Sequence, residues 1–263
     1  MTHPLYEELR PVTPLASVLL ARNPSPMTLD GTNTWVLRAP GVEECVVVDP
    51  GEDDAGHLAE VAEQGPVALV LITHRHPDHA GGARRFAELT GAPVRALDGS
   101  LVLGSEALGE GDVVAAAGVE LRVVTTPGHT SDSVSFLLDG PGAATAVLTG
   151  DTILGRGTTV IAHPDGQLGP YLESLRRLAD LAPGTAVLPG HGPELPDAPG
   201  VAAAYLAHRE QRLDQVRAAL TTLGPDASAR AVVESVYADV DRNLWPAAEL
   251  SVLAQLEHLR SGG

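Results

Sequence analysis

The sequence THRHPDHAGG, residues 73–82, places three of the chain's ten histidines and an aspartate within six positions. Their spacing of i, i+2, i+4 and i+5 cannot put all four side chains on one face of a helix or of a strand, so we expect a loop that wraps around a bound group. Burying so many polar groups without partners costs several kcal/mol, which argues against a packing role and favours metal binding. The four side chains are His74, His76, Asp78 and His79.

Four other apolar runs of strand length also end in side chains that can bind a metal ion. ECVVVD ends in Asp49, VVTTPGH in His129, AVLTGD in Asp151 and AVLPGH in His191. Layered α/β folds assemble their functional sites where strands leave the core, so we expect these side chains to converge on the histidine cluster. For Asp49 two interpretations stay open, a structural role in the turn DPGEDD or support of a ligand from behind.

Imidazole and carboxylate donors without thiolate suit zinc, iron or manganese rather than a cysteine-bound structural zinc. We expect two ions, one bound by the first two histidines of the cluster and the other by its aspartate and last histidine. His129 and His191 would complete the two coordination spheres, and Asp151, which has two oxygens, would bridge them. The expected ligands are His74, His76, Asp78, His79, His129, Asp151 and His191. The other histidines are expected to be ordinary surface or core residues, namely His3, His57, His163, His208 and His258.

In the first 200 residues, helical patterns lie between some of the short apolar runs, which indicates an α/β fold. Strand-length runs begin at residues 34, 44, 67, 119, 133, 145 and 185. Those at 44, 67 and 145 are continuously apolar, as in strands that are covered on both faces. Helical patterns over 80–91 and 169–184 each end at a glycine.

After residue 200 the pattern is helical only, with helices expected over 201–224, 226–240 and 246–263. Asp226 is expected to cap the second of these helices, and Pro246 stands at a helix start. The segment ELPDAPG before them has the composition of a linker. We therefore expect a catalytic domain over residues 1–200 and a small helical domain over residues 201–263.

The formal net charge is −17, because 17 arginines stand against 34 acidic residues and lysine is absent. The lack of lysine excludes Schiff-base catalysis and the phosphate-binding P-loop, and the negative charge disfavours nonspecific nucleic-acid binding. No apolar run approaches the roughly 18 residues of a membrane span, and the N-terminal segment lacks the pattern of a secretory signal. We expect a soluble, cytoplasmic protein without a membrane partner, in which the single cysteine, Cys45, is buried.

Taken together, the motifs resemble the metallo-β-lactamase superfamily. THxHxDH is present at 73–79, PGHT at 127–130, Gly-Asp at 150–151 and Gly-His at 190–191, and the likeness spans roughly residues 15 to 195. The resemblance implies a four-layer αββα sandwich with a dinuclear site at one edge of its two sheets. It also implies two divalent ions, zinc first with iron or manganese as alternatives, and a metal-bridging hydroxide that attacks an ester, thioester or phosphodiester bond.

By the same resemblance, Asp78 and Asp151 are the expected catalytic residues, with Asp78 orienting or deprotonating the attacking water. Two branches of the superfamily are similar to the chain. Glyoxalase II thioesterases normally have a glycine where this chain has Asp132. The β-lactamase-like-2 group, which includes a single-strand endoribonuclease and acyl-carrier thioesterases, resembles nearly the whole chain, and its tail is a winged-helix-like domain. Its likeness rests on DGTNTWVL at 30–37, RGTTV at 156–160, PGHGP at 189–193, AHREQRLDQV at 207–216 and the tail from residue 236.

A small-molecule acyl or ester substrate is expected, with thioester hydrolysis slightly favoured over cleavage of single-stranded RNA. Residues 201–263 carry six arginines against eight acidic residues, whereas nucleic-acid binders present a basic face. We therefore expect these residues to pack over the mouth of the active site. Arg209, Arg212 and Arg217 nevertheless fall at helical spacing and could line a local basic stripe. Two further hypotheses are a metal-sensing regulator and a mononuclear-iron dioxygenase acting on persulfides. The oligomeric state is not predicted.

Overall fold

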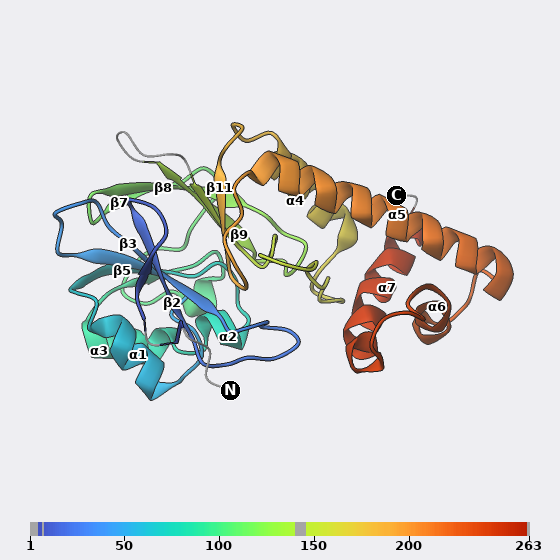
Figure 1. Ribbon diagram of the computed structural model, residues 1–263, viewed down its shortest axis with the longest axis horizontal. Coiled ribbons are helices and arrows are strands. Elements are labelled where there is room, and N and C mark those ends of the chain that lie inside the picture. Colours follow the sequence, from blue (N-terminus) through green and yellow to red (C-terminus); the bar gives the residue numbers. More distant parts are fainter. Residues whose placement is uncertain (1–4, 7, 140–145, 262–263) are drawn as a thin grey trace.

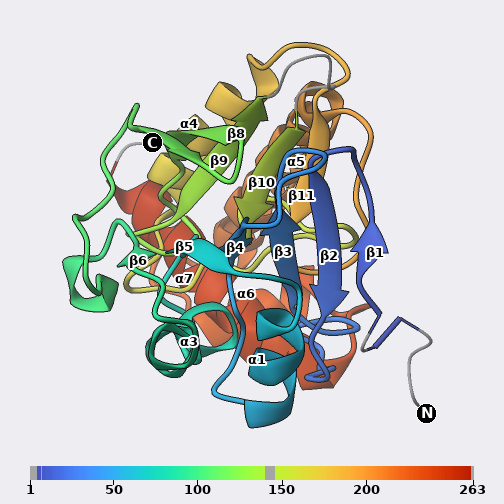
Figure 2. The same ribbon diagram turned by 90° about the vertical axis from the view of Figure 1, so that its left-hand side faces the viewer.

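Two β-sheets packed face to face form the centre of the molecule. The computed structural model describes residues 5–6, 8–139 and 146–261, and its sheets are seen in Figures 1 and 2. The first sheet has the order β1-β2-β3-β4-β5-β6 and the second the order β11-β10-β9-β8-β7. The strands of the first are β1 (Arg10–Pro11), β2 (Ala16–Leu20), β3 (Asn33–Leu37), β4 (Cys45–Val48), β5 (Val67–Leu71) and β6 (Val94–Arg95). Those of the second are β7 (Val113–Ala116), β8 (Val119–Thr125), β9 (Val134–Asp139), β10 (Ala146–Gly150) and β11 (Ala186–Pro189).

Helices cover the outer face of each sheet. The helices are α1 (Ala55–Ala62), α2 (Pro77–Ala80), α3 (Ala83–Thr90), α4 (Leu168–Ala179), α5 (Ala198–Leu223), α6 (Ala229–Val236) and α7 (Trp245–Arg260), with short 3-10 turns η1 (Gly99–Leu101) and η2 (Arg242–Leu244). Helices α1 and α3 pack on the first sheet, and α4 and the start of α5 pack on the second. The predicted αββα sandwich is therefore confirmed.

Alternating side chains of the central strands explain why these runs are apolar throughout. In β4, Val46 and Val48 point into the core between the sheets, whereas Cys45 and Val47 point toward α1 and α3. Strand β10 does the same, because Leu148 joins the core between the sheets and Val147 packs against α4. Each such strand is buried on both faces, as the continuous runs predict.

Several elements were not expected from the sequence. Strands β1 and β6 have two residues each, too short to give a periodic signal. Strand β7 is the four-residue VVAA, and its two alanines belong to a residue type that is depleted in strands. Strand β2 (ASVLL) lies inside an apolar run that the sequence did not mark as a strand. Helix α1 starts after Asp54, whose side chain accepts a hydrogen bond from the backbone amide of His57.

The C-terminal region is helical in all its regular elements from residue 198 to the last described residue, 261 (Figure 1). Two local expectations were wrong. Part of the supposed linker is helix, because Asp197 caps α5, which begins at Ala198. The cap of α6 is Ser228, whose hydroxyl accepts from the amide of Ala231, and not Asp226. Pro246 does lie in the first turn of α7.

The C-terminal helices contribute to two apolar clusters. The first part of α5 packs with α4 through residues such as Tyr205, and its later part packs with α6 and α7 through residues such as Val216 and Trp245. Because α5 contributes to both clusters, it ties the three C-terminal helices to the sandwich. We retain the division between residues 1–200 and 201–263 as a proposal.

Two predictions about burial and membranes can be compared with the structure directly. Cys45 is fully buried, and this burial raises the pKa of its thiol. In the described part of the chain, no helix is both long enough and apolar enough to cross a bilayer.

Candidate metal centre

The seven expected ligands come together at one edge of the sandwich. His74 lies just after β5, and Asp78 and His79 lie in the short helix α2. In the second sheet, Asp151 directly follows β10 and His191 follows β11. The remaining two are His76, which precedes α2, and His129, in the loop after β8. Segments far apart in sequence thus converge as the strand-end argument predicts.

One group of side chains consists of three histidines. The Nε2 atom of His74 lies 3.0 Å from Nδ1 of His76, and Nε2 of His129 lies 3.0 Å from the same Nδ1. One nitrogen from each ring lies within 4.8 Å of the others. Three imidazole nitrogens that converge in this way form a typical ligand set for one divalent ion.

A second group combines two histidines with an aspartate. The Nε2 atoms of His79 and His191 lie 3.2 Å apart. An Oδ2 atom of Asp78 lies 3.4 Å from Nε2 of His79 and 3.1 Å from Nε2 of His191. His79 and His191 are almost completely buried, so these nitrogens have little access to water other than at the centre itself.

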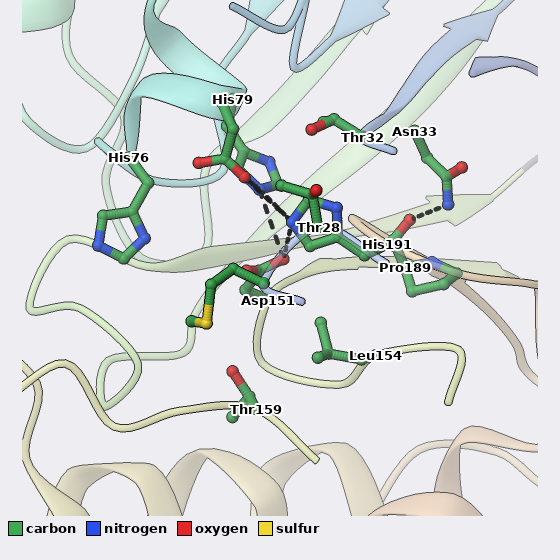
Figure 3. Close-up of polar contacts among 12 residues, drawn as sticks. Thr28, Thr32, Asn33, His76, His79, Asp151, Leu154, Thr159, Pro189 and His191 are labelled. Carbon is green, nitrogen blue, oxygen red and sulfur yellow. Dashed lines mark hydrogen bonds and ion pairs between the residues drawn. The ribbon is translucent and has the colours of Figure 1, made fainter. Parts of the chain in front are cut away.

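Asp151 contacts both groups, and Figure 3 shows its carboxylate beside His79 and His191. Its Oδ1 atom is 3.4 Å from Nε2 of both His79 and His191, whereas its Oδ2 atom is 3.6 Å from Nε2 of His129. Oδ1 is buried and has no hydrogen-bond partner of good geometry among the described residues. An unsatisfied buried carboxylate oxygen is costly, and a divalent cation would satisfy it. The residues present therefore fit a metal site, and one oxygen of Asp151 faces each group.

Hydrogen bonds behind the rings fix their orientation. Nδ1 of His79 is 2.8 Å from Oδ2 of Asp49, Nδ1 of His129 is 2.6 Å from the carbonyl oxygen of Val160, and Nδ1 of His191 is 3.1 Å from that of Gly31. Acceptors at Nδ1 keep the proton there and leave Nε2 free for a metal. Of the two interpretations of Asp49, support of a ligand is the one that the geometry favours.

Two glycines leave the space that the centre needs. A Cβ atom on Gly190 would lie 2.6 Å from Oδ1 of Asp151 and 2.7 Å from Cε1 of His79. A Cβ atom on Gly150, whose φ is +48°, would lie 2.6 Å from the hydroxyl of Thr73. The glycines of the Gly-Asp and Gly-His pairs are thus required by close approach of the two sheet edges.

Burial and the carboxylates set the protonation of the rings. Burial lowers the pKa of His74, of His76 and of His129. Burial also disfavours the charged form of His191, but the Asp151 carboxylate outweighs it and raises the pKa of His191 to about 9. The pKa of His79 is raised for the same reason, against the effect of burial. Metal binding to His79 and His191 must therefore displace protons, and it weakens as the pH falls.

An ion pair between an exposed arginine and a buried aspartate holds the loop that contains the first ligands. Arg75, between His74 and His76, donates from Nε to Oδ1 of Asp132 at 3.0 Å. Asp132 is only 5% exposed. The residue that departs from the glyoxalase II pattern is thus a structural anchor for the histidine loop, a role that the sequence did not reveal.

The isolated histidines lie outside the seven-residue centre, with His3 beyond the described residues. His57 is buried with Nε2 at 2.8 Å from the hydroxyl of Thr34, and His163 pairs with Glu257 at 3.3 Å. His208 differs from the expectation, because it lines a cavity beside the centre.

That cavity, of about 340 Å³, opens next to His129 and Asp151. Its other walls come from the loop around Thr159, from α5 and from the residues just before and within α7. In Figure 3, Leu154 and Thr159 lie on the side of Asp151 that is away from His79. A cavity of this size beside a metal site is typical of small-molecule binding. The C-terminal helices form one of its walls, as expected for a region that packs over the mouth of the site.

Comparison with known proteins agrees with this geometry. Residues 27–191 match the model of the metallo-beta-lactamase superfamily. The chain belongs to this superfamily. As a member of this superfamily, the chain is a metal-dependent hydrolase. Residues 228–263 match the beta-lactamase associated winged helix domain, so the metallo-beta-lactamase fold carries this domain at its C-terminus.

Several relatives of the metallo-beta-lactamase superfamily resemble almost the whole chain. A Beta-lactamase-like protein 2 homolog of Drosophila melanogaster is 32% identical over 93% of this chain and 87% of its own length. An Atrochrysone carboxyl ACP thioesterase of Aspergillus fumigatus is 33% identical over 84% of this chain and 69% of its own. The crystal structure of a Beta-lactamase domain protein from Burkholderia ambifaria superposes with a TM-score of 0.80 at 27% identity, covering 100% of this chain and 90% of the other. These likenesses support the β-lactamase-like-2 branch.

Proposed function

We propose that the protein is a dinuclear metal-dependent hydrolase of acyl thioesters. The observation that carries the dinuclear assignment is that the two oxygens of Asp151 face different groups of ligands. His74, His76 and His129 would hold one ion, and Asp78, His79 and His191 the other. Zinc is the first candidate, because nitrogen and carboxylate donors without thiolate suit it. When bound, such ions lower the pKa of a water molecule and polarise the scissile carbonyl group.

The protein's own residues orient the attacking water. Asp78 has a partly exposed side chain, at 21%, whereas that of Asp151 is 10% exposed. Burial opposes ionisation of Asp78, but its contacts with His191 and His79 keep the pKa of the carboxyl group well below its usual range. Asp78 is thus a carboxylate at neutral pH. It can accept a hydrogen bond from the attacking water and so orient it.

A thioester substrate is supported by two observations. The relative from Aspergillus fumigatus is named as an acyl-carrier-protein thioesterase. The cavity beside the centre has a mostly apolar wall, formed by Leu154, Val240, Leu244 and Ala248 among others, which suits an acyl chain. We propose that the acyl group enters this cavity with its carbonyl carbon toward Asp78 and Asp151.

Single-stranded RNA is less well supported as a substrate. The three arginines of α5 do not form one exposed stripe, because Arg209 is 3% exposed and lines the cavity, as does Arg212. Arg217 pairs with Asp214 at 2.8 Å. The basic stripe considered from the sequence is therefore absent from α5.

The test is to purify the protein without chelators, measure metal per chain, and assay that preparation on acyl thioesters and on single-stranded RNA. The proposal predicts two ions per chain and thioester hydrolysis that is lost with a chelator and restored by metal. Asp78→Asn should retain measurable metal and lose most of the turnover. Cleavage of RNA without thioester hydrolysis would contradict the proposal, and one iron per chain with oxygen consumption on a persulfide would replace it with dioxygenase chemistry.

A further inference from the structure

The cavity beside the metal centre has a local charge opposite to that of the chain. The chain as a whole has a net charge of −17. Three arginines line the cavity, Arg156, Arg209 and Arg212, whereas Asp151 is the one acidic residue among the described residues that line it. Bound metal ions would add further positive charge where the cavity meets His129 and Asp151. A cavity of this kind favours a substrate with negative charge.

Two of these arginines lack acidic partners. Arg156 pairs with Asp30, but within the described part of the chain neither Arg209 nor Arg212 forms an ion pair. Arg209 is 3% exposed, donates to the carbonyl oxygen of Thr159, and has a buried Nε atom without a partner. A buried cation without a counter-charge is costly, so a bound anion would offset a cost that the fold already carries.

The exposed arginines of the C-terminal helices show the contrast. Arg217 pairs with Asp214 at 2.8 Å, and Arg230 pairs with Glu234 at 3.0 Å and with Glu249 at 2.8 Å. Carboxylates thus pair with these two exposed arginines, whereas the described residues provide none for the two in the cavity. Carboxylates at the cavity would occupy the donors that a substrate anion needs.

Arg212 and His208 lie within one turn of α5 of each other. Arg212 is held in place, because its Nη1 atom donates to the side chain of Gln215 and to the carbonyl oxygen of Val236, and its guanidinium lies 4.6 Å from the centre of the Tyr237 ring. The Nδ1 atom of His208 is buried and has no hydrogen-bond partner among the described residues. Both side chains face the cavity with hydrogen-bonding capacity left over.

Arg209 lies between this pair and the metal centre. It donates to Thr159, whose hydroxyl is 3.1 Å from Nδ1 of His129. Arg212 is three residues farther along the helix, next to the end of α6. The cavity therefore has the hydrolytic centre at one end, an apolar wall from η2 and α7, and unpaired donors on α5.

We propose that Arg212, with His208, binds an anionic oxygen group of the substrate, so that the enzyme prefers thioesters that carry such a group to purely apolar ones. This inference rests on the proposed thioesterase function. The anion would be either a carboxylate on the acyl chain or the phosphate of a phosphopantetheine thiol arm. Both present the oxygens that a guanidinium binds in pairs.

The test compares wild type with Arg212→Leu on two pairs of thioesters. The first pair is the N-acetylcysteamine thioester of octanoic acid and the mono-thioester of octanedioic acid, neither of which contains phosphate. The second pair is octanoyl pantetheine and octanoyl 4′-phosphopantetheine. Wild type should prefer the anionic member of at least one pair by about tenfold in kcat/KM, the magnitude of one charge-assisted hydrogen bond. The pair that shows the preference identifies the source of the anion.

In Arg212→Leu the ratio of kcat/KM between the anionic and the neutral member should fall to about one. Arg217→Leu, on the same helix and outside the cavity, is the matched control and should keep the wild-type preference. Arg212→Lys should retain part of it, because the charge remains and the paired donors do not. The inference is overturned if wild type prefers the anionic member of neither pair, or if Arg212→Leu shows the same preference as wild type.

A binding measurement separates this inference from the proposed function. If the metal-loaded wild type hydrolyses no thioester, the proposed function fails, and calorimetry with octanoate, octanedioate and octyl phosphate still tests the cavity. One anionic group of each ligand can reach the metal centre, and octanedioate alone has a second. Tighter binding of octanedioate than of octanoate in wild type but not in Arg212→Leu supports the acyl-carboxylate form. Tighter binding of octyl phosphate than of octanoate, lost in Arg212→Leu, supports the phosphate form, and equal affinities in the two proteins for all three ligands contradict both.

Discussion

The carboxylate of Asp49 lies 2.8 Å from Nδ1 of His79 in the interior of the sandwich. The same carboxylate accepts hydrogen bonds from the backbone amide and the hydroxyl of Thr73, at 2.8 and 2.7 Å. Asp49 thus joins the end of β4 to the residue before His74 and to the ligand on α2. Its own φ of +54° is unusual for a residue other than glycine, so the backbone adopts a strained conformation where the carboxylate is needed.

Replacement of Asp49 by Asn should weaken metal binding by about 10- to 100-fold, the usual cost of losing the partner behind a metal-binding histidine. The amide cannot supply the negative charge that orients His79. Competition with a chromophoric chelator measures the affinity. Asp53→Asn is the control, because Asp53 lies in the same loop but pairs with Arg85 on the surface. Equal affinities of Asp49→Asn and wild type would contradict this role.

Gly190→Ala should lose metal with little effect on the remainder of the fold. The added methyl group would lie 2.6 Å from Oδ1 of Asp151 and 2.7 Å from the His79 ring, so one of these side chains must move. Metal per chain, determined by elemental analysis after gel filtration, is the measurement. Gly99→Ala provides the comparison, since nothing lies within 4 Å of a Cβ atom there. The account requires metal loss in the first variant and normal loading in the second.

His57 should make stability depend on pH. Its burial lowers the pKa to about 4 from the ordinary 6.5, so between these values the unfolded chain binds more protons than the folded one. The neutral imidazole therefore contributes about 3 kcal/mol to the free energy of unfolding, at about 1.4 kcal/mol per pKa unit. This contribution is fully present above pH 6.5 and is lost as the pH falls toward 4.

His57→Gln removes this titration while keeping a polar partner for Thr34. Urea unfolding of both proteins in the presence of a chelator, at pH 7 and at pH 4.5, gives the difference in the free energy of unfolding. Between pH 7 and pH 4.5, the free energy of unfolding of wild type should fall by roughly 2 to 3 kcal/mol more than that of His57→Gln. A difference that is constant between the two pH values would show that burial does not disfavour the charged imidazole.

Sequence periodicity indicated an α/β fold and the meeting point of the ligands, whereas the αββα layers were implied by the resemblance to the superfamily. Runs such as ECVVVD are apolar at every position because β4 is covered on both faces, and a polar residue that ends such a run emerges at the edge of the sheet. The same reasoning places His129, Asp151 and His191 near the histidine loop.

Other features of the site have no periodic signature. The contact between Asp132 and Arg75 depends on how two loops fold back, and the hydrogen bond from His129 to Val160 depends on a segment without regular structure. The cavity is formed only when α5 and α7 dock beside the sandwich. For this reason His208 was interpreted as an ordinary surface or core residue, and the arginines of α5 were considered as an exposed stripe.

Metal-edge anomalous diffraction combined with elemental analysis tests most directly whether Asp151 bridges two ions. The account predicts two ions per chain in wild type, one bound by His74, His76 and His129 and one by Asp78, His79 and His191, each contacting a different oxygen of Asp151. Asp151→Asn should retain at most one. A single ion in wild type, or two in Asp151→Asn at unchanged affinity, would contradict the account.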